Sequence, residues 1–598
     1  MKRAQKYIFA AAATLCMPGM AMADNNLRTE INVDRTVVPV QRPASPLSSV
    51  APSIVAPQIS THTLRPAEYG DVSEFDNTLA PLPVATYTGL KGRSPYKGYA
   101  ALGYFPAFNL GASAGYRFVS TDRTTLGAWM QYDGVSYKGH GEAAPLKADG
   151  GRQSVKQNTI TAGADFMQRF GQRSRLNASV DYTYGSLDMP SADPARTVLD
   201  EERRLSAFNA TASFHSAYGA VAWHIGGDFD HFGQTRDVAV GNLNGQTILP
   251  GASENLAGVH IGAHGQFSRT TYIGFEASAR FLHRNRGQLL LVTAEPSDAL
   301  ERPVTPVTFG NPEHRTNSIV KLRPYFGARA GRVNMRLGAD VNIVSGNLGS
   351  NVHVAPNVLL DWNPLSTVAV YANFRGGDSF NSLRSLYTRI GAAATGAFVY
   401  TSANTSIAAD FGFNIGPFYG AALELHGGYE CTHNALMPAV LEYASAITGA
   451  FLNTNLSGWR AGASLRYAWR DRIEAHASFD LLAHSYNSGF ADAYDRAKSV
   501  TKVELSGKPI EKLSVNASYE LRTGRRYYSV PVAGGASFTP EARAMENSSQ
   551  LDLGVRYMLT EAFSVGLKAE NLLGRHAEVL PWLPGQGIHG LLGIEVKF

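Results

Sequence analysis

Long two-faced segments constrain the fold of this chain more than any other feature of its sequence. From Gly98 onward, apolar residues alternate with polar or small ones, and successive side chains of a strand point to opposite faces. The clearest segments are residues 176–184, 273–281, 333–343, 459–470 and 513–522. Each spans roughly 10 residues, enough for a tilted strand to cross membrane hydrocarbon, whereas strands of soluble sandwiches are typically about 5–6 residues long. The pattern therefore favours membrane β structure, with one wall in lipid and the other in water.

The connections between these segments alternate in length. Short ones lie at 120–123, 171–173, 268–270, 331–332, 363–365, 470–472, 507–512 and 560–561. Long ones lie near 137–153, 186–203, 233–253, 285–315, 376–404, 433–455, 485–498, 524–546 and 572–586. Because outer-membrane barrels have short periplasmic turns and long external loops, the alternation predicts an all-β, antiparallel transmembrane barrel of about 22 strands. An even number of strands places both termini in the periplasm.

One of the long connections, residues 433–455, is unusually apolar for an external loop. Two interpretations are open: a short helix packed in the mouth of the barrel or against a partner, or a loop that packs on its neighbours.

The N-terminus has the composition of a secretory signal peptide. Basic residues precede an apolar run over 7–20, and Ala21-Met22-Ala23 is a small-x-small cleavage signal, which predicts a signal peptide over residues 1–23. Its removal leaves Cys431 as the sole cysteine, so the fold contains no intramolecular disulfide. Residues 24–96 are rich in proline and show little periodicity, which predicts an extended periplasmic or lumenal segment without a full plug domain. The barrel is expected over residues 97–598.

The chain ends on a two-faced strand. Its apolar row consists of Gly590, Leu592, Ile594, Val596 and Phe598. A closed barrel has no free edge, so a chain can stop at its final strand without a cap. The row and the terminal Phe resemble the C-terminal signal that the barrel-assembly machinery of Gram-negative outer membranes recognises. The alternative is an ordinary amphipathic edge strand.

The final segments "AENLLGRHAEVLPWLPGQGIHGLLGIEVKF" resemble the end of a TonB-dependent receptor, with Asn571-Leu572 before the last loop and Pro584-Gly585 within it. The resemblance extends to "INVDRTVVPVQRPASPLSSVAPSIVAP" near the start and to "GGDSFNSLRSLYTRI" after a mid-barrel strand. It implies a 22-stranded barrel in the outer membrane that mediates solute uptake. True receptors also carry a large folded plug, which the short N-terminal segment here does not match, so the chain resembles a plug-less branch of such barrels.

A short N-terminal stretch resembles a TonB box, the extended peptide that adds a strand to TonB. Its residues are Asp34, Arg35, Thr36, Val37, Val38, Pro39 and Val40. The alternative is a linker whose composition happens to favour β structure.

Charged residues on the inward positions are candidates for a permeation path. The best of them are Arg336, Arg460, Arg466, Arg470 and Arg556, which suggest a bore that tolerates anions. The alternative is a water-facing wall in which neighbouring strands pair their charges. Side chains alone cannot fill so wide a barrel, so the N-terminal segment, inward-folded loops or a partner is expected to close it.

Other function classes find no support in the sequence. Histidines lack HExxH spacing, and neither a phosphate-binding loop nor a basic block of the nucleic-acid type occurs. We therefore predict no enzyme activity, cofactor, metal or nucleic acid, and a barrel that contacts outer-membrane lipid. Passage or uptake of a solute is the leading interpretation. The alternative is a non-transporting scaffold or accessory barrel in a complex with a surface lipoprotein or another outer-membrane subunit.

Overall fold

A computed structural model defines the fold. It describes residues 96–106, 109–138, 154–188, 202–234, 238–242, 245–249, 252–285, 290–293, 305–308, 315–346, 349–385, 402–443, 446–469, 472–486, 497–531, 541–575, 577–580 and 583–598. The expected signal peptide and nearly all of the N-terminal segment lie outside these ranges. No helix within them is long and apolar enough to cross a membrane.

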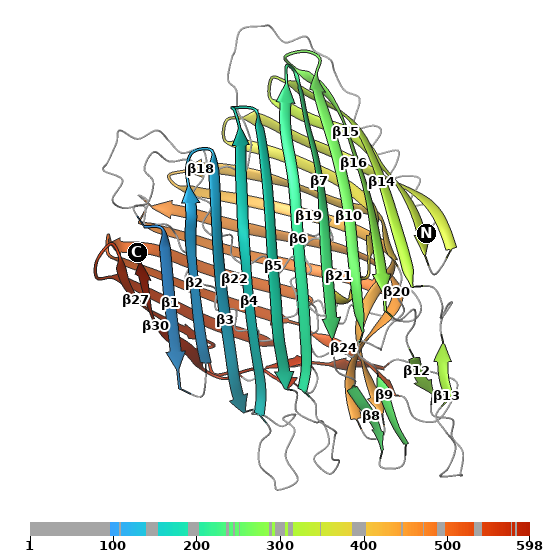
Figure 1. Cartoon of the computed structure of the whole chain (residues 1–598), viewed down its shortest axis with the longest axis vertical. Coiled ribbons are helices and arrows are strands. Elements are labelled where there is room, and N and C mark those ends of the chain that lie inside the picture. The colour runs from blue at the N-terminus through green and yellow to red at the C-terminus, as the bar shows by residue number, and fades with distance from the viewer. Residues whose placement is uncertain are drawn as a thin grey trace.

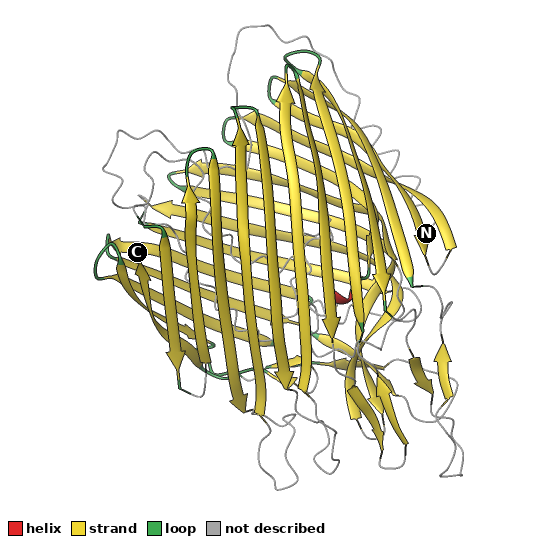
Figure 2. Ribbon diagram, viewed as in Figure 1, coloured by secondary structure: helices red, strands yellow, loops and turns green. Residues whose placement is uncertain are grey.

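The described strands form one large antiparallel barrel (Figures 1 and 2). Its main sheet contains 24 strands. Of these, β24 (Arg526–Pro531) and β25 (Glu541–Ala544) attach at the rim through a parallel pairing of β24 with β19, which leaves 22 strands in the wall. The barrel of about 22 strands predicted from the sequence is therefore confirmed.

The wall strands, in order around the barrel, are β1 (Gly98–Phe105), β2 (Asn109–Ser120), β3 (Thr124–Lys138), β4 (Ser154–Phe170), β5 (Ser174–Asp188), β6 (Glu202–Tyr218), β7 (Val221–Gln234), β10 (Ser253–Gln266), β11 (Thr271–Arg284), β14 (Thr316–Ala330), β15 (Val333–Gly346), β16 (Gly349–Leu365), β17 (Val368–Phe380), β18 (Ser402–Phe418), β19 (Ala421–Tyr443), β20 (Ala446–Trp469), β21 (Ile473–Tyr486), β22 (Ser499–Ile510), β23 (Leu513–Thr523), β26 (Ser548–Met558), β27 (Phe563–Glu570) and β30 (His589–Lys597). Three small hairpins lie in the long connections: β8 (Val238–Asn242) with β9 (Gly245–Leu249), β12 (Leu290–Thr293) with β13 (Thr305–Thr308), and β28 (Glu578–Leu580) with β29 (Leu583–Pro584).

The barrel closes between its first and last strands. β1 pairs with β30 in antiparallel register from Tyr99↔Lys597 to Tyr104↔Leu592. At the chain end, the carbonyl of Phe598 accepts hydrogen bonds from the backbone N–H of Lys97 at 2.8 Å and of Gly98 at 2.7 Å. Both ends of the barrel segment therefore lie at the rim that carries the short turns.

The alternation of side chains gives the wall an apolar outer face. Aromatic side chains are exposed in two belts, as in barrels that cross a membrane. At the short-turn rim the belt consists of Phe118, Phe170, Tyr218, Phe267, Trp362, Phe418, Tyr419, Tyr467, Trp469, Tyr557 and Phe598. Toward the long connections it consists of Tyr104, Tyr184, Phe208, Phe229, Phe281 and Trp459. Between the belts the exposed residues are mostly aliphatic, with some further aromatic ones such as Phe411 and Phe413, and together they complete a lipid-facing band.

The predicted alternation of short and long connections holds with exceptions. The two-residue turns at 219–220 and 419–420 escaped the sequence analysis, and only residues 347–348 separate β15 from β16 at the long-connection rim. The interpretation of 433–455 as a loop or short helix is wrong, because β19 continues to Tyr443 and β20 begins at Ala446. The ladder between them resumes after an irregularity at Thr432/Ala435. An apolar run that lacks strict alternation does not show by its periodicity whether it forms a helix or a strand.

Candidate functional site

The inner wall of the barrel carries charged side chains that are paired across strands. On β20, Trp459 is exposed on the outer face, so the next residue, Arg460, points to the inner face. There Arg460 forms an ion pair with Asp410 on β18. Arg375 on β17 reaches the same carboxylate at 3.0 Å. Between β18 and β20, Gly428 makes room for the bridge, since a Cβ there would lie 2.8 Å from Arg460 Nε and 3.0 Å from Asp410 Oδ1.

Similar pairs continue along the wall. They include His426 with Asp480 at 2.6 Å, the Tyr371 hydroxyl donating to Glu424 at 2.9 Å, Arg323 with Asp340 at 2.9 Å, and Lys502 with Glu520 at 3.6 Å. These networks alternate the two signs of charge around a water-facing surface. The inner wall is therefore polar, and neither positive nor negative charge dominates in these networks.

β17 leaves the wall through a distorted end. The register with β18 shifts between Arg375 and Gly377, and Gly377 has φ +126°, a conformation that favours glycine. The following Asp378 is buried against the wall, where its carboxylate lies 2.9 Å from His353 Nδ1 and accepts a hydrogen bond from Asn404 at 3.2 Å. The ladder with β18 continues beyond Asp378 to Phe380↔Ser402, and the chain turns inward after that pair.

The segment that follows is a strap on the inner side of the barrel, formed by residues Asn381–Ser385. It contains a helical turn over 383–385, red in Figure 2. The Ser382 hydroxyl accepts a hydrogen bond from the backbone N–H of Ser385 at 3.1 Å and caps the turn. Leu383 and Arg384 are buried. We call this segment the lumenal strap.

A buried charge cluster holds the lumenal strap. Arg384 forms an ion pair with Asp230 on β7, and its backbone N–H donates to Glu254 on β10 at 3.2 Å. On β11, Arg284 donates to the backbone carbonyl of Asn381 at 2.9 Å. Glu254 and Arg284 lie 3.4 Å apart, and each side chain is only 2% exposed. Charges buried this deeply persist only when they are paired and hydrogen-bonded.

The strap connects parts of the wall that are far apart around the ring. β10, β11, β14, β15 and β16 lie between β7 and β17. Asp230, Glu254 and Arg284 all stand near the long-connection ends of their strands. The strap therefore narrows the mouth of the barrel on that side, and it is an instance of the inward-folded loop that the sequence analysis offered as one way to close the bore.

The predicted lumen arginines do not converge on one site. Arg336 on β15 donates to Asn357 at 3.1 Å and lies over the Tyr325 ring, Arg460 pairs with Asp410, and Arg556 on β26 pairs with Glu595. Arg466 is exposed near the short-turn rim, and Arg470 lies outside the described residues. The TonB-box-like residues 34–40 also lie outside them.

In the C-terminal row, Leu592, Ile594, Val596 and Phe598 are exposed on the outer face, whereas Gly590 packs against the backbone of Lys568.

The strap cluster is the functional feature that sequence reasoning missed. Asp230, Glu254 and Arg284 come from three different strands, and nothing in their spacing indicates that they meet. The one available signal was the "GGDSFNSLRSLYTRI" segment, which contains the paired glycines, Asp378 and the strap itself. The described residues include no group of three or more His, Cys, Asp or Glu side chains that could hold a metal ion.

No protein-family model matches the chain, and no curated protein matches its sequence. Solved structures do match. The ferripyoverdine receptor of the outer membrane of Pseudomonas aeruginosa, bound to ferripyoverdine, aligns with a TM-score of 0.59 at 14% identity, covering 85% of this chain and 72% of that chain. The FrpB iron transporter from Neisseria meningitidis aligns with a TM-score of 0.59 at 11% identity, covering 85% and 82%. The outer membrane transporter YddB from Escherichia coli aligns with a TM-score of 0.54 at 11% identity, covering 85% and 81%. At these identities the likeness concerns the fold, and it confirms the large antiparallel barrel expected from the sequence.

Proposed function

We propose that the protein is an outer-membrane barrel that takes up a solute. The observation that carries the proposal is a closed 22-strand wall, apolar between two aromatic belts outside and lined with paired charges inside. Such a wall separates lipid from a polar interior wide enough to hold more than side chains. The likeness to barrels described as receptors and transporters supports the same function.

The orientation follows from the connections. Barrels of this kind place short turns in the periplasm and long loops outside. The short-turn rim, where both ends of the barrel segment lie, would then face the periplasm, and the lumenal strap would lie on the external side. A periplasmic N-terminus would let residues 34–40 reach TonB, and the C-terminal row would serve the barrel-assembly machinery.

Ferric chelates are the first solute class to test, because two of the compared structures are described as a ferripyoverdine receptor and an iron transporter. Cells that express the protein as their sole candidate receptor should accumulate radiolabelled iron from one member of a siderophore panel. Uptake should stop when the proton-motive force is dissipated. Failure across the panel would remove ferric chelates as the substrate class without excluding other solutes.

A second experiment separates transport from the scaffold alternative. Purified protein in planar bilayers should show conductance once residues 24–96 are deleted, since the remaining wall encloses a polar bore. Background conductance in that variant, combined with stable co-purification of an outer-membrane subunit, would favour the scaffold.

A third experiment tests the TonB-box-like segment. TonB should co-purify with the full chain and be lost when residues 37–40 are replaced by glycine and serine. Equal recovery of TonB with both proteins would remove the box.

A further inference from the structure

Four neighbouring strands form a hollow in the outer wall. Their register aligns Phe411, Gly427, Ala461 and Leu481 in one row across β18, β19, β20 and β21. The two middle positions carry at most a methyl group, whereas Phe411 and Leu481 are 43% and 51% exposed. The Phe411 ring lies over the buried Gly427, so the open floor of the hollow is the exposed Ala461, between Phe411 and Leu481.

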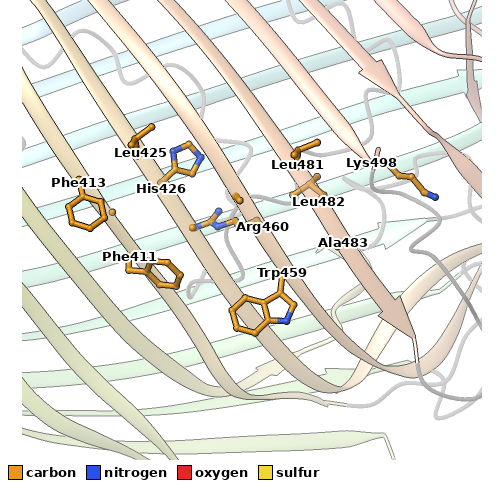
Figure 3. A pocket seen from close by; sticks show the side chains of 13 residues that line it. Phe411, Phe413, Leu425, His426, Trp459, Arg460, Leu481, Leu482, Ala483 and Lys498 are labelled. Carbon is orange, nitrogen blue, oxygen red and sulfur yellow. The ribbon is translucent and has the colours of Figure 1, made fainter. Parts of the chain in front are cut away.

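Larger side chains close the two ends of the hollow. Toward the long connections, the rings of Tyr429 and Trp459 lie with their centroids 4.6 Å apart. Toward the short turns stand Phe413 and Leu425, as Figure 3 shows. The hollow measures about 630 Å³, and its lining is almost wholly apolar. Gly427 contributes to the shape by admitting the Phe411 ring, since a Cβ there would lie 2.8 Å from that ring.

The hollow lies inside the lipid-facing band. From Ala421, at the short-turn end of β19, the chain rises to Gly427 over roughly 20 Å at about 3.3 Å per residue. A strand tilt of about 40° reduces this to roughly 15 Å of height in a band about 25 Å tall. The hollow therefore begins beyond the middle of the band, in the half nearer the long connections, and its walls meet hydrocarbon instead of water.

Shape is the property that makes this place a candidate for lipid binding. Lipid tails gain no hydrophobic advantage from one apolar surface over another, so preferential binding comes from packing contacts. A chain on a flat wall is touched from one side, whereas a chain in the hollow is touched by its floor and by both sides, which multiplies its dispersion contacts. Aromatic side chains at three corners add rigid contact area.

We propose that this hollow, the acyl groove, seats one acyl chain of lipopolysaccharide from the outer leaflet. The choice of lipid rests on the outer-membrane orientation proposed above, because the groove lies in the half of the band next to the external loops. It does not depend on transport. The retained lipid is a structural partner of the strands that also carry the Asp410–Arg460 bridge on their inner face.

Native mass spectrometry of the full chain, extracted from outer membranes and washed repeatedly in mild detergent, tests the proposal. The wild type should retain one adduct with the mass of lipopolysaccharide. Ala461→Leu fills the floor and should lower its occupancy about tenfold, or about 1.4 kcal/mol. Ala277→Leu is the matched control, because Ala277 is also an outer-facing alanine, lies on β11 away from the groove, and should leave occupancy unchanged. Heat-modified migration in electrophoresis verifies that each variant is folded.

Three results would overturn the proposal: no retained lipid in the wild type, equal occupancy in Ala461→Leu, or a protein dimer or phospholipid in place of the adduct. If Ala461→Leu does not fold, fluorescence quenching decides. In vesicles of brominated phosphatidylcholine, a seated acyl chain should shield Trp459 from quenching. The fluorescence of Trp459 is obtained by subtracting the spectrum of Trp459→Phe from that of the wild type. It should be quenched at least about twofold less than the fluorescence of the outer-facing Trp223, and equal quenching would contradict the groove. Because neither readout measures uptake, failure here leaves the proposed function standing.

Discussion

The Glu254–Arg284 pair offers the sharpest test of how the lumenal strap is held. The two side chains are 3.4 Å apart and 2% exposed, so neither has water available when its partner is removed. Glu254 also accepts the backbone N–H of Arg384, and Arg284 also donates to the carbonyl of Asn381. The pair therefore connects two wall strands to each other and to the strap.

Removing one charge should cost more than removing both. Glu254→Leu leaves the Arg284 guanidinium buried without its carboxylate, a change that typically costs about 3–5 kcal/mol. The double variant Glu254→Leu/Arg284→Met removes both charges and replaces them with apolar groups of similar size, which is often close to neutral. It still loses the two hydrogen bonds to the strap, at roughly 1 kcal/mol each. We therefore expect the double variant to be less stable than the wild type by about 2 kcal/mol, and more stable than Glu254→Leu.

Urea unfolding in phospholipid vesicles, followed by tryptophan fluorescence, measures these free energies. Asp228→Asn is a suitable control, because Asp228 and Arg280 form a more exposed inner-wall pair at 3.8 Å, which should contribute less than about 1 kcal/mol. If the strap detaches before the barrel unfolds, the cost appears instead as faster hydrogen exchange over residues 381–385. A Glu254→Leu variant with unchanged stability and unchanged exchange, or a double variant as unstable as the sum of both singles, would refute the reasoning.

Three further predictions concern other parts of the wall. Gly428→Ala should lower stability by roughly 1–3 kcal/mol through overpacking against Arg460, measured by the same unfolding assay. Asn571 has φ +51° and donates to the carbonyls of Arg575 at 2.6 Å and Gln586 at 2.7 Å. Asn571→Ala should therefore lower the urea midpoint more than Asn571→Gly, because glycine tolerates that conformation. The reverse order of midpoints would contradict this account. Deletion of Phe598 removes the backbone hydrogen bonds that its carbonyl and N–H form with Lys97 and Gly98, and it should reduce the yield of heat-modifiable barrel in outer membranes.

The barrel could be predicted from the sequence because the alternation of apolar and polar residues is a local property of each strand. In β15, Met335 and Leu337 face one way and Arg336 the other, and a strand of this length has few alternatives. The terminal Phe and the turn at Gly331–Arg332 were likewise local signals. The same reasoning failed over 433–455, where an apolar run without clear alternation continues two wall strands beyond the barrel.

The candidate site depended on tertiary placement that no local pattern contains. Arg384 and Asp230 are separated by 154 positions in the chain. They meet because the strap that follows β17 reaches β7 across the inner side of the five strands between them. The outer hollow is similar, since Phe411, Ala461 and Leu481 line it together only because the registers of β18 to β21 place them in one row. Knowing the strand order without the register would predict neither feature.

Consecutive glycines on β19 show how one stretch of wall serves both faces. Gly427 points outward, where the missing side chain lets the Phe411 ring lie across the strand. Gly428 points inward, where the missing side chain lets Arg460 cross to Asp410. Because neighbouring side chains of a strand lie on opposite faces, each glycine accommodates a neighbouring side chain on one face of the sheet and leaves the other face unchanged. Lipid contact outside and charge pairing inside can therefore be altered separately in the same strand, although both depend on one backbone register.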